Sequence, residues 1–102
     1  MLWGVMCLRY VIVYDISDDN KRFKVARALE QWGLARIQRS AFTGSLQVAR
    51  VRDLARRLES IIDVDSDVVH IIPVQPQDWA RVIVLGKPYW VAGRVEEAIL
   101  LP

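Results

Sequence analysis

A chain of 102 residues, 53% apolar and 25% charged, is long enough to bury the core of one domain and too apolar to be intrinsically disordered. Its one cysteine, Cys7, excludes an internal disulfide framework and a thiolate metal cluster, and it favours a reducing, cytoplasmic location. The net charge of +2 combines a basic half, with eleven Lys/Arg against five Asp/Glu in residues 1–57, and an acidic half, with three against seven in residues 58–102. A basic half favours a polyanionic partner such as nucleic acid, although solvated arginine-rich helix faces would give the same pattern.

The first expected strand covers residues 10–15, and a short apolar stretch precedes it. We expect residues 1–8 to be an extension with little order of its own, with Met6 as an alternative start of the chain. Arg9 ends this stretch well short of the roughly 20 residues that a membrane span needs, and no signal-peptide pattern is present. Residues 10–14 are apolar on both strand faces, which is typical of a strand covered on both sides, and Asp15 follows directly.

A helix is predicted to follow this strand. Residues 17–20 offer side chains that accept hydrogen bonds from free backbone N–H groups, and we expect Asp18 and Asp19 to cap the helix start. Apolar residues then recur with helical spacing at Val25, Ala28, Leu29 and Trp32. Gly33 stands where a left-handed C-terminal cap is expected, so the helix should have about three to four turns.

The remaining segments complete an α+β pattern. Residues 35–46 predict a strand that bends or forms a short hairpin, with a turn or bulge at residues 43–45. Residues 51–62 predict an amphipathic helix, and residues 68–74 and 80–85 predict two strands. This order favours a single ferredoxin-like βαββαβ sandwich, in which two helices cover one face of a mostly antiparallel sheet.

Two helices would leave the second face of this sheet bare, although the first strand is apolar on both sides. A second copy of the chain is the simplest cover, so we expect a homodimer packed through the sheet faces. The tail, residues 87–102, is apolar at both of its ends, and we expect it to dock on the partner subunit.

Asp15 is the candidate site residue because it stands at the end of a buried strand, a rigid place for a side chain. Mg²⁺ binds one or two carboxylates and completes its shell with waters and substrate phosphate. One aspartate supplies few ligands for a metal ion, but two copies of Asp15 that face each other across a dimer axis would share a metal or a proton. The alternative is that Asp15 caps the loop before the helix. Phosphate-loop, dinucleotide, zinc-hydrolase and cysteine-cluster motifs are missing, and one histidine, His70, gives little support to a catalytic triad.

The stretch YVIVYDISDDNKRFKVARALEQWGLARIQRSAFTGSL, residues 10–46, resembles the N-terminal signature of the second core CRISPR-associated protein family. The likeness continues more loosely through DVVHIIPV and RVIVLG. It implies a ferredoxin-like homodimer in which two first-strand aspartates hold Mg²⁺, or another divalent cation such as Mn²⁺, for endonuclease cleavage of RNA or double-stranded DNA. It also implies a role in CRISPR adaptation, in which the dimer bridges integrase dimers and binds prespacer DNA.

The resemblance assigns roles to individual residues. Asp15 matches the catalytic, metal-binding aspartate, and Tyr14 matches the aromatic residue before it. The positions that bind nucleic acid are matched by Arg22, Lys24, Arg36 and Phe42. Arg39 matches a position that varies in the family, so no role is assigned to it. Members differ in substrate, and some show no cleavage. The alternatives are therefore a purely architectural subunit, with Arg50, Arg52, Arg56 and Arg57 as further binding candidates, or a related small toxin-like ribonuclease.

Overall fold

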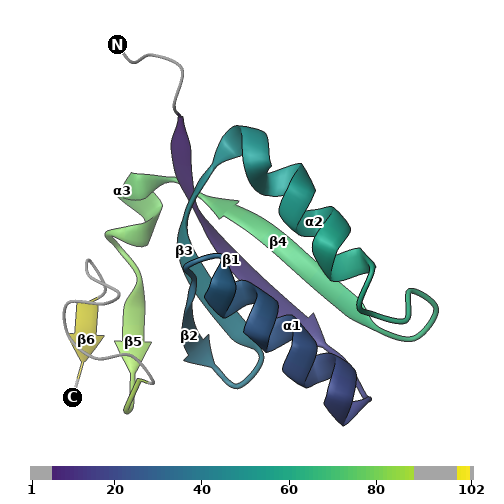
Figure 1. Ribbon diagram of the computed structural model, residues 1–102. Coiled ribbons are helices and arrows are strands. Elements are labelled where there is room, and N and C mark those ends of the chain that lie inside the picture. The colour runs from purple at the N-terminus through teal and green to yellow at the C-terminus, as the bar shows by residue number, and fades with distance from the viewer. Residues whose placement is uncertain (1–5, 89–98, 102) are drawn as a thin grey trace.

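The computed structural model describes residues 6–88 and 99–101, and its main body is a four-stranded sheet with two helices on one face (Figure 1). The elements are β1 (Cys7–Asp15), α1 (Asp19–Gln31), β2 (Ala35–Gln38), β3 (Ala41–Gln47), the 3₁₀ turn η1 (Val48–Arg50), α2 (Val51–Glu59), β4 (Val68–Val74), α3 (Pro76–Trp79), β5 (Ile83–Leu85) and β6 (Ile99–Leu101). The strand order is β2-β3-β1-β4, with every neighbouring pair antiparallel. This is the predicted ferredoxin-like sandwich. In the described part of the chain, no helix is long and apolar enough to cross a membrane.

Both ends of α1 have the caps that the sequence predicts. The Asp18 carboxylate accepts a hydrogen bond from the backbone N–H of Lys21 at 2.9 Å. At the other end, Gly33 has a φ of +88°, and the N–H of Leu34 donates to the carbonyl of Leu29 at 3.0 Å. This geometry is a Schellman cap, and it brings two buried leucine side chains together at the helix end. The caps fix where α1 begins, and therefore where the loop after β1 lies.

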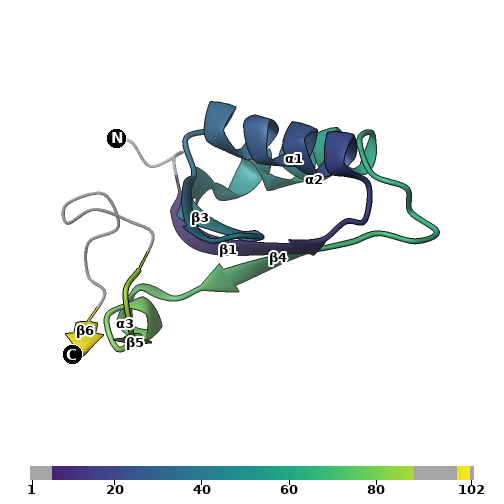
Figure 2. The ribbon, with the colours of Figure 1, turned by 90° about the horizontal axis from the view of Figure 1, so that it is seen from below.

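The two faces of the sheet differ. On the helix side, Tyr10, Ile12 and Tyr14 of β1 are buried in a core that also contains residues of α1, α2 and β3. On the other side, Val13 and Ile72 remain 38% and 44% exposed. Figure 2 shows α1 and α2 on one side of β1 and β4, whereas α3 lies on the other side, beyond the end of β4. The second face is therefore open around Val13 and Ile72 in the single chain, and its cover by a second copy stays a prediction.

The hairpin of β2 and β3 turns earlier than the sequence pattern indicated. Arg39 and Ser40 form the turn, and residues 43–45 lie inside β3, so the prediction of a turn or bulge there was wrong. The irregularity lies in β2 instead, between Arg36 and Gln38. Gly44 is needed for packing, because a Cβ atom at this position would lie 2.7 Å from Cδ2 of Leu34.

The segment after β4 also differs from the prediction of one strand over residues 80–85. Pro76 opens the short helix α3, and a strand follows only at residues 83–85. This strand, β5, pairs in parallel with β6 in a separate two-stranded sheet. Trp79 is 4% exposed, and the guanidinium carbon of Arg9 lies 4.4 Å from the centre of its ring. The side-chain packing of Trp79 therefore favours a helical turn here over a longer strand.

The sequence pattern predicted an extension at residues 1–8 and a docking tail at residues 87–102. Because β1 begins at Cys7, residues 7 and 8 belong to the sheet and not to an extension. Residues 1–5 lie outside the described residues, as do residues 89–98 and 102 of the tail. Docking of the tail on a partner subunit stays a prediction.

Candidate active site

A pocket with a volume of about 680 Å³ opens where the end of β1, the start of α1 and the β2–β3 turn meet. The charged residues that line it are Asp15, Asp19, Arg22, Arg36 and Arg39. Three arginines and two aspartates give this lining a net charge of one positive unit. A basic pocket with a carboxylate at its edge suits a phosphodiester, because it offers donors to the phosphate oxygens and a ligand to a cation.

Asp15 is the last residue of β1 and is exposed. Residues alternate along a strand, so Asp15 lies on the same open sheet face as Val13, opposite the buried Tyr14. Among residues 6–88 and 99–101, nothing donates a hydrogen bond to its carboxylate. Because Asp18 is the residue that caps α1, capping does not explain Asp15. Its carboxylate is free to bind a ligand.

The donor set of a single chain is small for a divalent cation. The described residues contain no group of three or more His, Cys, Asp or Glu side chains that could hold a metal ion. Asp19 lines the same pocket, but its carboxylate is paired with Arg22. His70 is exposed on the open face, opposite Val13 and outside the pocket. Among the residues that line this pocket, one chain therefore offers one unpaired carboxylate, and the chemistry fits Mg²⁺ only where two copies each contribute Asp15.

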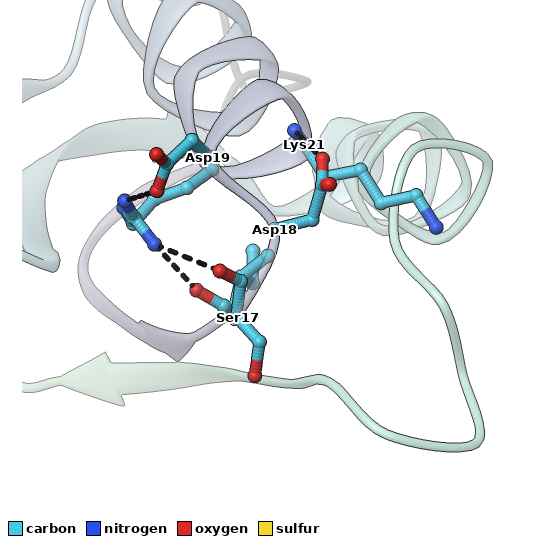
Figure 3. Close-up of polar contacts among 6 residues, drawn as sticks. Ser17, Asp18, Asp19 and Lys21 are labelled. Carbon is cyan, nitrogen blue, oxygen red and sulfur yellow. Dashed lines mark hydrogen bonds and ion pairs between the residues drawn. The ribbon is translucent and has the colours of Figure 1, made fainter.

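Arg22 is tied to the loop that follows Asp15. Its guanidinium donates to the carbonyl of Ile16 at 2.9 Å and pairs with the carboxylate of Asp19. Figure 3 shows these contacts of Asp19 beside the cap that Asp18 forms. Asp18 therefore caps the helix as predicted, whereas Asp19 lies in the first turn and pairs with Arg22 instead of capping it. The Arg22 side chain remains 41% exposed, which leaves it able to reach a phosphate at the pocket mouth.

Arg36 lies on top of a buried aromatic pair. Its guanidinium carbon is 4.8 Å from the centre of the Phe42 ring, and it also donates to the carbonyl of Arg39. The Phe42 ring stacks on Tyr14, with 6.3 Å between the ring centres. Phe42 has no exposed surface, so the sequence-based assignment of a nucleic-acid contact to Phe42 needs correction. It supports Arg36 from below instead of touching a ligand.

Tyr14 has the environment of a neutral phenol. Burial raises its pKa above the usual 10.0, and the positive charge of nearby Arg36 only partly opposes this rise. Its hydroxyl points at the carbonyl of Arg39, with 3.5 Å between the oxygens, a long and therefore weak hydrogen bond. At neutral pH Tyr14 stays protonated, so it can donate a hydrogen bond but does not serve as a base.

Lys24 does not belong to this pocket. It is exposed on α1 and lines a second hollow between α1 and α2, together with Arg27 and Arg57. The structure therefore brings Asp15, Tyr14, Arg22 and Arg36 together and leaves Lys24 outside.

Two pocket residues were not identified from the sequence. Arg39 is exposed in the β2–β3 turn, at a position to which the resemblance assigned no role. Phe23 is 62% exposed on α1 and also lines the pocket. A signal for Phe23 was present, because it lies two residues before Val25 and hence on the side of the helix opposite the apolar stripe.

Comparisons with known proteins agree on one family. The family model of the CRISPR associated protein Cas2 matches residues 6–82. A CRISPR-associated endoribonuclease Cas2 of Archaeoglobus fulgidus is 40% identical over 78 residues, which cover 76% of this chain and 83% of that protein. A CRISPR-associated endonuclease Cas1/endonuclease Cas2 fusion of Thermoproteus tenax is 49% identical over 55 residues, or 54% of this chain and 21% of the fusion.

Solved structures show the same similarity. A hypothetical protein from Thermus thermophilus superposes with a TM-score of 0.73 at 34% identity, over 83% of this chain and 98% of that one. The crystal structure of Streptococcus pyogenes Cas2 superposes with a TM-score of 0.63 at 25% identity, over 72% of this chain and 93% of that one.

Proposed function

Since this chain belongs to the family of the CRISPR associated protein Cas2, we propose that it is a metal-dependent endonuclease of RNA or DNA that also serves as a subunit of CRISPR adaptation. The observation that carries the nuclease proposal is the unpaired, exposed carboxylate of Asp15 at the edge of a pocket lined by three arginines. The name endoribonuclease, given to the relative from Archaeoglobus fulgidus, supports the same class of chemistry.

The open sheet face supports a homodimer. Val13, Val68 and Ile72 are exposed apolar residues on β1 and β4, and a second copy packed on them would remove this surface from water. Asp15 lies at the end of the same face, beside Val68 in the β1–β4 register. A twofold axis near this end would bring two Asp15 carboxylates together, which is the donor set that a single chain lacks.

The residues of each chain then have distinct tasks. The Asp15 pair would hold a divalent cation, which would activate water and neutralise charge on the scissile phosphate. Arg22 and Arg36 donate to phosphate oxygens and orient the backbone, so binding should be largely independent of sequence and sensitive to salt. Phe42 and Tyr14 keep the Arg36 guanidinium in place, and the protonated Tyr14 hydroxyl is a further hydrogen-bond donor at the pocket wall.

The adaptation role has separate support. The relative from Thermoproteus tenax carries a Cas1 and a Cas2 endonuclease in one chain, which suggests that this chain works beside an integrase. In that role the dimer would bridge integrase dimers and hold prespacer DNA on its basic surface. An architectural subunit would use the same arginines without cleavage, and a toxin-like ribonuclease would need no integrase.

The deciding experiment compares Asp15→Asn with Asp65→Asn, an exposed aspartate outside the pocket, in two assays. The first assay measures Mg²⁺-dependent cleavage of RNA and duplex DNA, and the second measures spacer integration with the cognate integrase. We expect Asp15→Asn alone to lose cleavage while integration persists. A wild-type protein without metal-dependent cleavage of any substrate would contradict the nuclease proposal and leave the architectural one. A lack of integration with intact RNA cleavage would favour the toxin-like alternative.

A further inference from the structure

Among the Phe, Tyr and Trp side chains of residues 6–88, Phe23 is the one that is exposed; the others are buried or partly buried. It lies on α1 one turn before Arg27, whose guanidinium carbon is 5.7 Å from the centre of its ring. That separation is close to the outer limit of a cation–π contact, and Phe23 keeps 62% of its surface accessible. A large part of the ring is therefore available to a ligand.

Two basic hollows meet at this ring. On one side lies the pocket of Asp15, with the guanidinium groups of Arg22 and Arg36. On the other side lies a groove of about 380 Å³ between α1 and α2, lined by Lys24, Arg27 and Arg57 among others and by no acidic residue. Phe23 lines both hollows. A polyanionic strand that passes from one hollow to the other would cross the ring.

The surroundings of Phe23 favour a nucleic acid over a protein as the occupant. The exposed apolar residues of the sheet, such as Val13 and Ile72, lie on the open face and not beside Phe23. Phe23 is instead an isolated exposed ring between two hollows, each of which is lined by more cationic than anionic side chains. A flat ring flanked by phosphate-binding side chains is the arrangement with which proteins bind unpaired nucleotides, because every base can stack on it whatever the sequence.

We propose that Phe23 is a stacking platform for an unpaired base, and that the strand's phosphates are held by Arg22 and Arg36 on one side and by Arg27 and Arg57 on the other. This inference rests on the proposed nucleic-acid function and specifies its substrate: a single strand, or a duplex with an unpaired end. Inside a blunt duplex the bases are paired and stacked on one another, so apart from its two terminal base pairs it presents no free face to the ring.

The test measures binding of wild-type protein and Phe23→Ala to three labelled ligands by fluorescence anisotropy. The ligands are a single-stranded oligothymidylate, a strand of the same length and charge whose central sugars carry no base, and a blunt duplex. We expect Phe23→Ala to weaken binding of the normal strand by about 5- to 100-fold. Binding of the abasic strand and of the blunt duplex should stay unchanged. A duplex with a frayed end, compared with the single strand, distinguishes the two sources of the unpaired base.

Two further variants separate stacking from apolar contact and from charge. Phe23→Trp should retain the preference for the normal strand over the abasic one, whereas Phe23→Leu should lose it. Arg27→Gln should weaken both strands and reduce the dependence of affinity on salt, because it removes a phosphate contact. Circular dichroism and urea unfolding check that each variant is folded, which we expect because the mutated side chains are exposed.

The outcomes separate this inference from the function on which it rests. Wild-type protein that binds no nucleic acid would overturn both. Wild-type protein that binds all ligands, with Phe23→Ala unchanged or with equal losses on normal and abasic strands, would overturn base stacking alone. Unchanged strand binding together with loss of integrase binding in Phe23→Ala would identify a protein contact and overturn the stacking proposal.

Discussion

The guanidinium carbon of Arg36 lies 4.8 Å from the centre of the Phe42 ring, so a half-buried cation of the pocket is supported by a fully buried aromatic. Phe42→Ala should lower the free energy of unfolding by about 3–5 kcal/mol, because it leaves a cavity in the core. Arg36→Ala should lower it by no more than about 1 kcal/mol and should mainly weaken nucleic-acid binding. Urea unfolding measures the stability of both variants, and titration with a labelled single strand measures their affinity for nucleic acid. A stable Phe42→Ala variant with impaired binding would show instead that Phe42 contacts the ligand.

A second prediction concerns the close approach of β3 to the end of α1. Gly44→Ala would place a Cβ atom 2.7 Å from Cδ2 and 3.4 Å from Cα of the buried Leu34. The overlap should cost about 1–3 kcal/mol of stability. Leu34→Ala costs stability by itself, but combined with Gly44→Ala it should cost less than the sum of the two changes, because it removes the clash. Ser45→Ala, at the exposed neighbouring position, is the control. Additive costs in the double mutant would contradict the packing explanation.

Patterns within a single element predicted the fold well. The stripe of Val25, Ala28, Leu29 and Trp32 identified the core face of α1, and Asp18 and Gly33 marked its ends. The end of the apolar run in β1 also separated Asp15 from the two acids at the start of the helix. These features depend on local hydrogen bonding and on the period of the element, which a sequence displays directly.

Features that depend on contacts between distant segments were missed. Gly44 indicated a turn, but Leu34 is the reason for a glycine at this position. The helical turn of α3 is fixed by Trp79 packing near Arg9, some 70 residues away in the chain. Phe42 was assigned to ligand binding, but the register of β3 turns its ring into the core. No local pattern reports these contacts, so the sequence alone did not predict them.

Trp79 should anchor the C-terminal segment of the described chain. Trp79→Ala removes a side chain that is 96% buried and that stacks on Arg9, so α3 and β5 should open locally while the four-stranded sheet stays folded. Hydrogen exchange should become faster in residues 80–85 and stay unchanged in α1. Asp78→Ala is the control, since it removes only an exposed ion pair with Arg81. Equal protection of residues 80–85 in wild-type protein and Trp79→Ala would contradict this role.

Tyr14 predicts a change in stability at alkaline pH. Burial raises its pKa in the folded chain above the 10.0 of an exposed phenol, so the unfolded chain loses this proton first as the pH rises. The contribution to stability is therefore fully present below about pH 10 and is lost as the pH rises toward the folded pKa. Tyr14→Phe lacks this titration. Urea unfolding from neutral to alkaline pH should show a steeper loss for wild-type protein than for Tyr14→Phe, and parallel curves would contradict the assignment.

The open face of the sheet predicts the effect of charge on the proposed dimer. Val13 of β1 pairs with His70, and Ile72 of β4 pairs with Val11, so Val13 and Ile72 are diagonal neighbours on this face. Both side chains are exposed in the single chain. Val13→Asp or Ile72→Asp would place a carboxylate in a dry interface between two copies, where an unpaired charge is strongly unfavourable. Either change should therefore convert a dimer into a monomer, which sedimentation velocity measures directly.

The control for this change is Val48→Asp, which adds the same charge at an exposed position of η1, away from the open face. It should leave the dimer intact. The monomeric variants should stay folded and lose metal-dependent cleavage together with dimerisation, because each chain offers only one unpaired Asp15 carboxylate. A monomeric Val13→Asp variant that still cleaves would show that one Asp15 is enough. A wild-type protein that is monomeric at micromolar concentration would remove the basis for a shared metal.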